Sequence, residues 1–188
     1  LDMLGADVSR VHVLLGASDG GDVSLADVDI IADAIEQTGA ALLVVDPVQS
    51  WLGGRVDMHR ANETRPVLDA LNGTCARYGC ACLVVAHTPK ARGNRPVTAA
   101  LGSIDFAAAA RIMLIVGTDP ADSTRRVLAG AKNNIGPDPD SLAYTISRED
   151  GAFEWLGAVS TTASDILAAD TATEDERGAL AEAVEWLA

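Results

Sequence analysis

Two continuous apolar runs, each followed by a polar residue and a nearby proline, constrain this chain more than any other feature. The first is ALLVVD, which ends at Asp46 before Pro47, and the second is CACLVVAH, which ends at His87 before Pro89. Strands that are apolar on both faces are typical of parallel sheets covered by helices on both sides. Ligands of such sheets gather at the carboxyl ends of the strands, so Asp46 and His87 are candidate site residues.

Helical patterns separate the predicted strands. SLADVDIIADAIEQTG repeats its apolar residues at helical spacing, with Ser24 as the expected N-cap and Gly39 as the expected stop. Residues 61–78 predict a second helix that ends at Gly79, and FAAAA, residues 106–110, predicts a short third helix. Strands that alternate with helices predict an α/β fold with a mostly parallel, twisted sheet flanked by helices.

Further strands are expected at both ends of this pattern. RVHVLLG, residues 10–16, and RIMLIVG, residues 111–117, each read as a strand. RRVLAGAKNN and LAYTISR flank the turn-rich IGPDPD and predict a closing antiparallel hairpin, with AFEWLG as a possible third strand. We expect one domain over residues 1–160, followed over residues 161–188 by a linker and the start of a helical region. The polar segment AADTATEDE, residues 168–176, is the expected linker.

Composition excludes several classes of protein. A length of 188 residues suits about one domain, and the net charge of −13 argues against a surface that wraps nucleic acid. No apolar run is long enough to span a membrane, and the first residues do not resemble a signal peptide. The spacing of Cys75, Cys80 and Cys82 fits no usual zinc pattern, so we expect reduced, packed thiols and a cytoplasmic protein.

Four segments, taken in order, resemble one family of ATPases. LLVVD resembles a Walker B strand, and LVVAH with TPK resembles the next strand of RecA-like ATPases, which ends in a sensor of the γ-phosphate. LGSIDFAAAARIMLIV is similar to the Gly-Ser segment and following strand of DnaB-type replicative helicases, and AKNNIGP to their closing hairpin. The order and spacing are closest to the RepA-like branch, the AAA-type ATPases of plasmid and phage replication. The resemblance covers roughly residues 11–156.

The resemblance implies a role for several single residues. Asp46 would organise Mg²⁺, and His87 would sense whether ATP or ADP is bound. Lys132 would reach as a finger into the ATP of the neighbouring subunit, where a cation stabilises the charge on the transferring phosphoryl group. The family pattern has an Arg two residues after this Lys, whereas this chain has Asn134, which leaves Lys132 alone in the role.

The resemblance also assigns residues to the nucleotide site and to a pore that holds DNA. Gln49 and Ser50, together with Gly102 and Ser103, are expected to bind or shape the cofactor site. The loop HTPKARGNRPVTAALGS corresponds to a pore loop that grips single-stranded DNA, and the basic side chains expected to contact it are Lys90, Arg92 and Arg95. An ordinary solvated loop is the alternative.

One essential part of an ATPase is missing from the sequence. The phosphate-binding pattern G-x-x-x-x-G-K-[ST] does not occur, and the glycine cluster GASDGGD, residues 16–22, has two acids and no Lys. In the family, the P-loop strand and the strand that ends in the catalytic Glu precede this region. The start at Leu1 and a last segment, AEAVEWLA, that stops within a helical pattern also suggest a piece of a longer polypeptide. We therefore expect the Walker B half of an ATPase, inactive alone.

The intact parent would bind ATP and Mg²⁺, assemble as a hexameric ring and move along single-stranded DNA. Two alternatives stay open. One is a RecA-like recombinase or KaiC-like ATPase with the same skeleton, against which the KNNIGP hairpin and the short loop after His87 argue. The other is a non-hydrolysing domain that only assembles with partners or binds DNA. A phosphate-binding motif encoded upstream of Leu1 would support an ATPase, and its absence would support the non-hydrolysing domain.

Overall fold

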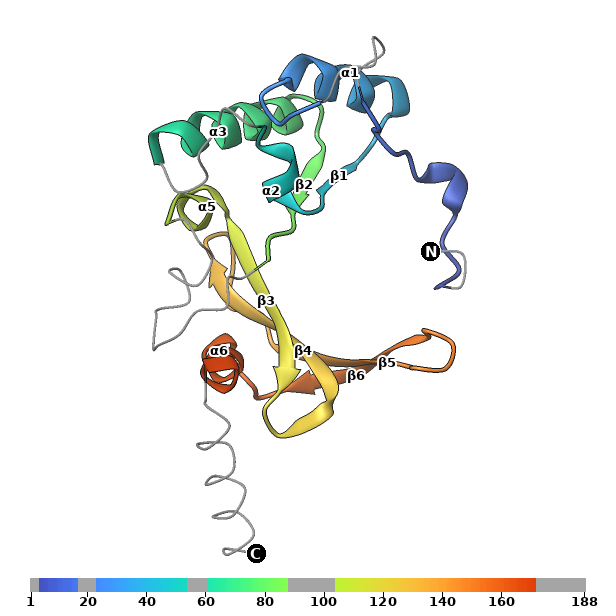
Figure 1. Ribbon diagram of the computed structural model, residues 1–188, viewed down its shortest axis with the longest axis vertical. Coiled ribbons are helices and arrows are strands. Elements are labelled where there is room, and N and C mark those ends of the chain that lie inside the picture. Colours follow the sequence, from blue (N-terminus) through green and yellow to red (C-terminus); the bar gives the residue numbers. More distant parts are fainter. Residues whose placement is uncertain (1–3, 17–22, 54–60, 88–103, 172–188) are drawn as a thin grey trace, which may run out of the picture. The chain divides into compact units, whose positions relative to one another are not determined.

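The computed structural model describes residues 4–16, 23–53, 61–87 and 104–171. Within these ranges the chain forms two compact units (Figure 1). Unit 1 holds the described residues up to His87 together with residues 104–110, and unit 2 holds residues 111–171. None of the helices in the described ranges is both long enough and apolar enough to cross a membrane.

Unit 1 packs helices against one face of a parallel pair of strands. In the pair, Leu42 of β1 lies opposite Ala81 of β2, and Val45 lies opposite Val84. This pairing confirms the two parallel strands predicted from the apolar runs. The elements of unit 1 are η2 (Val8–Arg10), α1 (Val28–Thr38), β1 (Leu42–Val45), α2 (Val48–Trp51), α3 (Ala61–Arg77), β2 (Ala81–Val84) and α5 (Ile104–Ala109).

The core of unit 1 lies on one face of this pair of strands. Ile31 and Ile35 of α1, Val45 of β1 and Leu71 of α3 are all buried in it. Two glycines, Gly39 and Gly79, follow the helices that pack on this core, as the sequence predicts, and both have a left-handed φ. Gly39 adopts a left-handed φ of 63° and its N–H donates to the Ile35 carbonyl at 2.8 Å, which ends α1.

Two local predictions for unit 1 are wrong. Ser24 is not the N-cap of α1, because the helix begins at Val28 and its N-cap is Asp27. The Ser24 N–H and hydroxyl both donate to Asp27 Oδ2 at 2.8 Å, which forms a turn ahead of the helix. Residues 11–15 are not a strand either. A strand needs a neighbour for its main-chain groups, and none of the described strands pairs with this segment.

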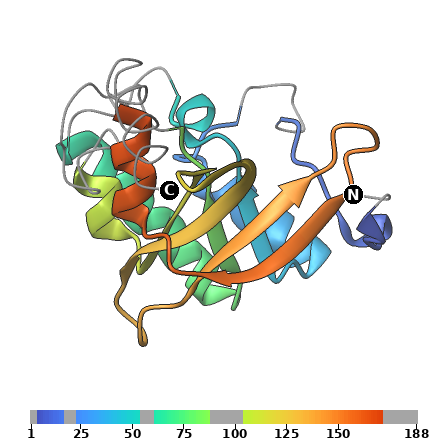
Figure 2. The same ribbon diagram turned by 90° about the horizontal axis from the view of Figure 1, so that it is seen from below.

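Unit 2 is a four-stranded antiparallel sheet with one helix packed on it (Figure 2). The strands follow each other in chain order across the sheet, which confirms the predicted hairpin and its third strand. The elements of unit 2 are β3 (Ile112–Asp119), β4 (Asp122–Asn133), β5 (Ser141–Ile146), β6 (Phe153–Val159) and α6 (Ala163–Thr171).

The direction of β3 differs from the expected sheet. Only Pro120 and Ala121 separate β3 from β4, and so short a connection allows antiparallel pairing alone. The described strands therefore form a parallel pair and an antiparallel sheet of four, in place of one mostly parallel sheet. The fold is mixed α/β.

Helix α6 was not expected from the sequence. Its first turn is capped reciprocally, because Thr162 Oγ1 donates to Asp165 Oδ2 at 2.6 Å and accepts from the Asp165 N–H at 3.2 Å. Ile166 is 1% exposed against the sheet. The helix extends through Thr171, so the expected linker does not begin at Ala168.

Candidate functional site

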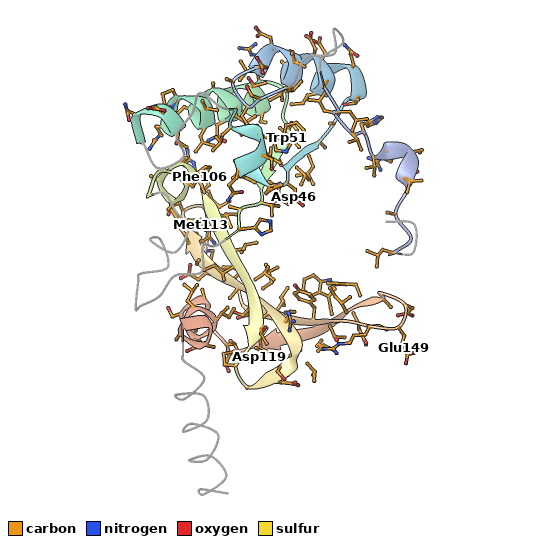
Figure 3. The ribbon with its side chains drawn as sticks, viewed as in Figure 1. Asp46, Trp51, Phe106, Met113, Asp119 and Glu149 are labelled. Carbon is orange, nitrogen blue, oxygen red and sulfur yellow. The ribbon has the colours of Figure 1, made fainter. Side chains whose placement is uncertain are left out.

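The connection between β1 and α2 holds the main site candidate, Asp46. β1 ends at Val45, and Pro47, in an extended conformation, is the N-cap of α2. Figure 3 marks Asp46 at this junction. Its side chain is exposed, and it makes no hydrogen bond or ion pair within the described part of the chain. Asp46 is therefore a carboxylate that the fold leaves accessible to a ligand.

Two main-chain hydrogen bonds fix this junction to the neighbouring strand. The Val85 N–H donates to the Val45 carbonyl at 2.9 Å, and the Val48 N–H donates to the Val85 carbonyl at 2.8 Å. Val48 is fully buried, so the first turn of α2 is held by its side chain as well as by its main chain. The carboxyl ends of β1 and β2 are thereby tied together, with Asp46 on the connection that leaves β1.

His87 lies on the same side of the parallel pair. It is exposed and follows the last residue of β2, Val84, by three positions. Because β1 and β2 are parallel, both segments leave the sheet at its carboxyl edge. The structure thus brings the chain positions of Asp46 and His87 to one edge, as the sequence predicted. The role of each side chain stays a prediction.

Helix α2 adds a feature that sequence reasoning could not foresee. The Oε1 atom of Gln49 is buried, and no donor reaches it within the described residues. An unsatisfied buried acceptor costs about 1–3 kcal/mol. Ser50, in contrast, is exposed. Trp51 packs against the core of unit 1 and holds the helix in place.

The donor set at Asp46 fits a magnesium ion better than a metal held by protein alone. Within the described ranges, no group of three or more His, Cys, Asp and Glu side chains is placed to hold a metal ion. Mg²⁺ commonly takes one or two carboxylates and fills its other positions with water and substrate phosphates. A single accessible carboxylate such as Asp46 is compatible with that mode of binding.

The other predicted site residues divide into two groups. Lys132 belongs to unit 2, where it lies in β4 opposite Met113. It is half-buried and has an interaction partner, and its role as a finger stays a prediction. The remaining residues lie outside the described ranges, and they are Lys90, Arg92, Arg95, Gly102 and Ser103.

The three cysteines are free thiols in the core of unit 1, as the sequence predicted. Burial raises the pKa of the Cys75 thiol, and it raises the pKa of the Cys82 thiol to about 12. A thiol with a raised pKa carries little thiolate near neutral pH, and the thiolate is the nucleophilic form. The cysteines are therefore packing residues of the core.

One protein family matches the part of the chain that contains the parallel strands and the exposed Asp46. Residues 3–93 match the model of the AAA domain family. The matched range contains β1, α2 and β2, and therefore Asp46, Gln49 and His87. This part of the chain is therefore similar to AAA domains, which suggests a nucleotide-binding, ATPase-type function. A search of curated proteins finds no match.

Proposed function

We propose that this chain is part of the ATPase core of a RepA-like hexameric helicase, which couples ATP hydrolysis to movement along single-stranded DNA. The observation that carries the proposal is Asp46. Its carboxylate is exposed at the carboxyl end of a parallel strand and has no partner among the described residues, and it lies inside the range that matches the AAA domain. This position is where ligands of α/β sheets bind.

In this proposal each residue at the sheet edge has one task. Asp46 would hold Mg²⁺, and the ion would supply positive charge for the phosphates. His87 reports the state of the γ-phosphate to the segment that follows it. Gln49 offers its buried carboxamide oxygen to a donor that arrives with the nucleotide or with the segment that holds the nucleotide.

In this proposal the groups that bind the nucleotide phosphates come from a segment outside residues 1–188. No G-x-x-x-x-G-K-[ST] pattern occurs in the sequence, so the main-chain N–H groups and the Lys that hold the phosphates are supplied by another segment. We propose that this segment is encoded upstream of Leu1, because the family pattern places the P-loop strand and the catalytic Glu before the Walker B strand.

The decisive experiment measures ATP hydrolysis by the polypeptide extended upstream of Leu1. Asp46→Asn should lower turnover at least about a hundredfold, or about 2.7 kcal/mol, because it removes the anchor of the metal and nearly preserves the shape. Asp33→Asn, on the exposed face of α1, is the matched control and should change turnover less than about threefold. If Asp46→Asn retains turnover like the control, Asp46 has no Walker B role.

The helicase assignment has a separate test. Replacing Lys90, Arg92 and Arg95 together with Ala should weaken binding of single-stranded DNA and flatten its salt dependence, because fewer counterions are released. A fluorescent oligonucleotide titrated at several salt concentrations measures both effects. An unchanged salt slope would remove the support for DNA contact by this loop while leaving the ATPase assignment intact.

A second candidate function follows from the missing phosphate-binding pattern. A domain without its own cradle can assemble with partners and hydrolyse nothing. The upstream coding sequence distinguishes the two candidates. A phosphate-binding motif in a strand–loop–helix context within about 60 residues of Leu1 favours the ATPase, and its absence favours the assembly domain.

A further inference from the structure

Strand β4 contains an extra residue directly before Lys132. Lys132 lies opposite Met113 of β3. The next pair joins Leu114 to Gly130, which leaves Ala131 without an opposite residue. An extra residue of this kind is a β-bulge, which bends its strand and changes the direction of the side chains beside it. The orientation of Lys132 therefore depends on how the end of β4 is held.

Asn133, the last residue of β4, closes the loop that follows Lys132. Its Nδ2 donates to the Pro137 carbonyl at 2.5 Å, and its Oδ1 accepts from the Ile135 N–H at 3.1 Å. An asparagine that accepts from the N–H two residues later forms an Asx turn, which fixes the start of a loop. One carboxamide therefore bonds to the main chain at two points of the loop.

Two further contacts anchor the same loop to the sheet. The Asn134 N–H donates to the Arg111 carbonyl at 3.0 Å, next to the start of β3. Pro139 packs over Gly130, where an added Cβ atom would lie 3.2 Å from Pro139 Cγ. The loop is thus bonded to β3 near its beginning and folds back on β4 near its end. In sequence, Lys132 lies between the two positions that these contacts hold.

A fixed main chain matters most for a lysine that acts through its charge. A cation stabilises a phosphoryl-transfer transition state best when it is held in place before the reaction. The lysine side chain itself is flexible, so its position depends on the supporting residues around it. Lys132 lies one residue from the end of β4, and strand ends open more easily than strand centres.

We propose that Asn133 is a positioning residue, whose carboxamide holds the main chain of Lys132 in the orientation that a finger requires. Asn133 acts through Lys132 and does not itself contact the nucleotide. This inference rests on the proposed function and on the role of Lys132 in it.

The first test measures the loop in the chain of residues 1–188. Asn133→Ala should speed amide exchange at Ile135 at least about tenfold, because this N–H loses its acceptor. NMR follows the exchange, and the Gly151 amide, which donates to the Ser147 carbonyl in the β5–β6 turn, should keep its rate. Unchanged exchange at Ile135 overturns the proposal, since the carboxamide then holds nothing.

The second test measures ATP hydrolysis by the polypeptide extended upstream of Leu1. Asn133→Ala should lower kcat at least about tenfold and leave KM within about twofold, because it displaces a group that acts in the transition state. Asn72→Ala, on the exposed side of α3, is the matched control and should leave kcat within about twofold. Equal kcat values for the two variants overturn the proposal.

A double variant separates positioning from a general loss of stability. Adding Asn133→Ala to Lys132→Ala should cost no further turnover, because the group that Asn133 positions is already absent. A further tenfold loss in the double variant would show that Asn133 acts independently of Lys132, and it overturns the proposal.

Mixed assemblies give the same distinction between subunits. Asn133→Ala subunits mixed with Asp46→Asn subunits should regain part of the activity, because some interfaces then have both sides intact. Mixed with Lys132→Ala subunits they should regain none, because both changes lie on the same side of the interface. Activity regained in this second mixture overturns the proposal.

The single variants distinguish a failure of this inference from a failure of the proposed function. Turnover that falls in Lys132→Ala and not in Asn133→Ala overturns the positioning role alone. Turnover that stays unchanged in Lys132→Ala removes the finger itself, and the positioning role is overturned with it.

Discussion

The Arg125 Nε donates to Asp119 Oδ2 at 2.6 Å across the turn that joins β3 to β4. The Asp119 side chain is buried, whereas the Arg125 side chain is 30% exposed. Asp119 Oδ1 also accepts from the Ala121 N–H at 2.9 Å and from the Thr161 hydroxyl at 3.3 Å. One carboxylate therefore joins the first hairpin of unit 2 to the connection between β6 and α6. Figure 3 labels Asp119.

Removing this carboxylate should destabilise unit 2. We expect Asp119→Ala to lower the free energy of unfolding by about 2–3 kcal/mol, because three donors lose their acceptor and one of them belongs to a charged side chain. Asp122→Ala is the control, since Asp122 lies at the same turn, is only half-buried, and within the described residues its side chain accepts hydrogen bonds from Thr124 alone. Urea denaturation of both variants measures the difference. Equal losses of unfolding free energy in the two variants would show that the buried carboxylate contributes no more to stability than the accessible one.

The packing of α6 on the sheet depends on the absence of a side chain at Gly117. A Cβ atom built there would collide with Cγ2 of Ile166, which is 1% exposed and β-branched. Gly117→Ala should therefore destabilise the protein by about 1–3 kcal/mol. Adding Ile166→Ala to it should cost less than the sum of the two single changes.

A second glycine provides the control for this prediction. Gly73 lies inside α3, where an added Cβ meets no atom within 4 Å. Gly73→Ala should raise the free energy of unfolding by about 0.5–1 kcal/mol, because alanine loses less conformational entropy in a helix. If Gly117→Ala lowers the thermal stability no more than Gly73→Ala does, Ile166 of α6 does not pack tightly against Gly117 of β3.

Cys82 should make stability depend on alkaline pH. Burial is the main cause that raises the pKa of this thiol from 9.0 to about 12, and the neighbouring thiol of Cys75 adds to the rise. The unfolded chain therefore loses this proton first, and stability should fall as the pH rises from about 9 towards 12. Urea denaturation across this range should show a shallower fall for Cys82→Ala. Identical slopes would contradict the buried, protonated thiol.

The sequence alone predicts weak nucleotide binding by residues 1–188. Without the phosphate-binding pattern, no nest of N–H groups and no cradle Lys is available for the phosphates. Isothermal titration of the chain with Mg-ATP should detect no binding tighter than about millimolar, which corresponds to about −4.1 kcal/mol. Micromolar binding would show that another segment of this chain holds the nucleotide.

The proposed role of Lys132 predicts complementation between subunits. In the upstream-extended protein, Lys132→Ala should reduce ATP turnover at least about a hundredfold while nucleotide affinity stays nearly unchanged. Mixing Lys132→Ala subunits with Asp46→Asn subunits should restore part of the activity, because some interfaces then pair an intact Asp46 with an intact Lys132. Mixed assemblies that form and stay inactive would exclude action across the interface.

Features that depend on neighbouring residues could be predicted from the sequence alone. Gly39 and Gly79 follow α1 and α3 closely, both with left-handed φ angles, because glycine adopts that conformation without steric cost. Continuous apolar runs predicted β1 and β2. The carboxylate of Asp46 directly follows β1 in the sequence, before Pro47. The chemistry expected of Asp46 and His87 also came from their positions after these runs.

Which segments pair and which polar atoms become buried depends on tertiary contacts. Residues 10–16 alternate as a strand does, yet they have no strand neighbour among the described residues, and β3 runs antiparallel because its nearest partner is β4. The buried oxygen of Gln49 and the buried carboxylate of Asp119 depend on distant segments of the chain. Pairing and burial are set by contacts between residues far apart in sequence, which local periodicity does not encode.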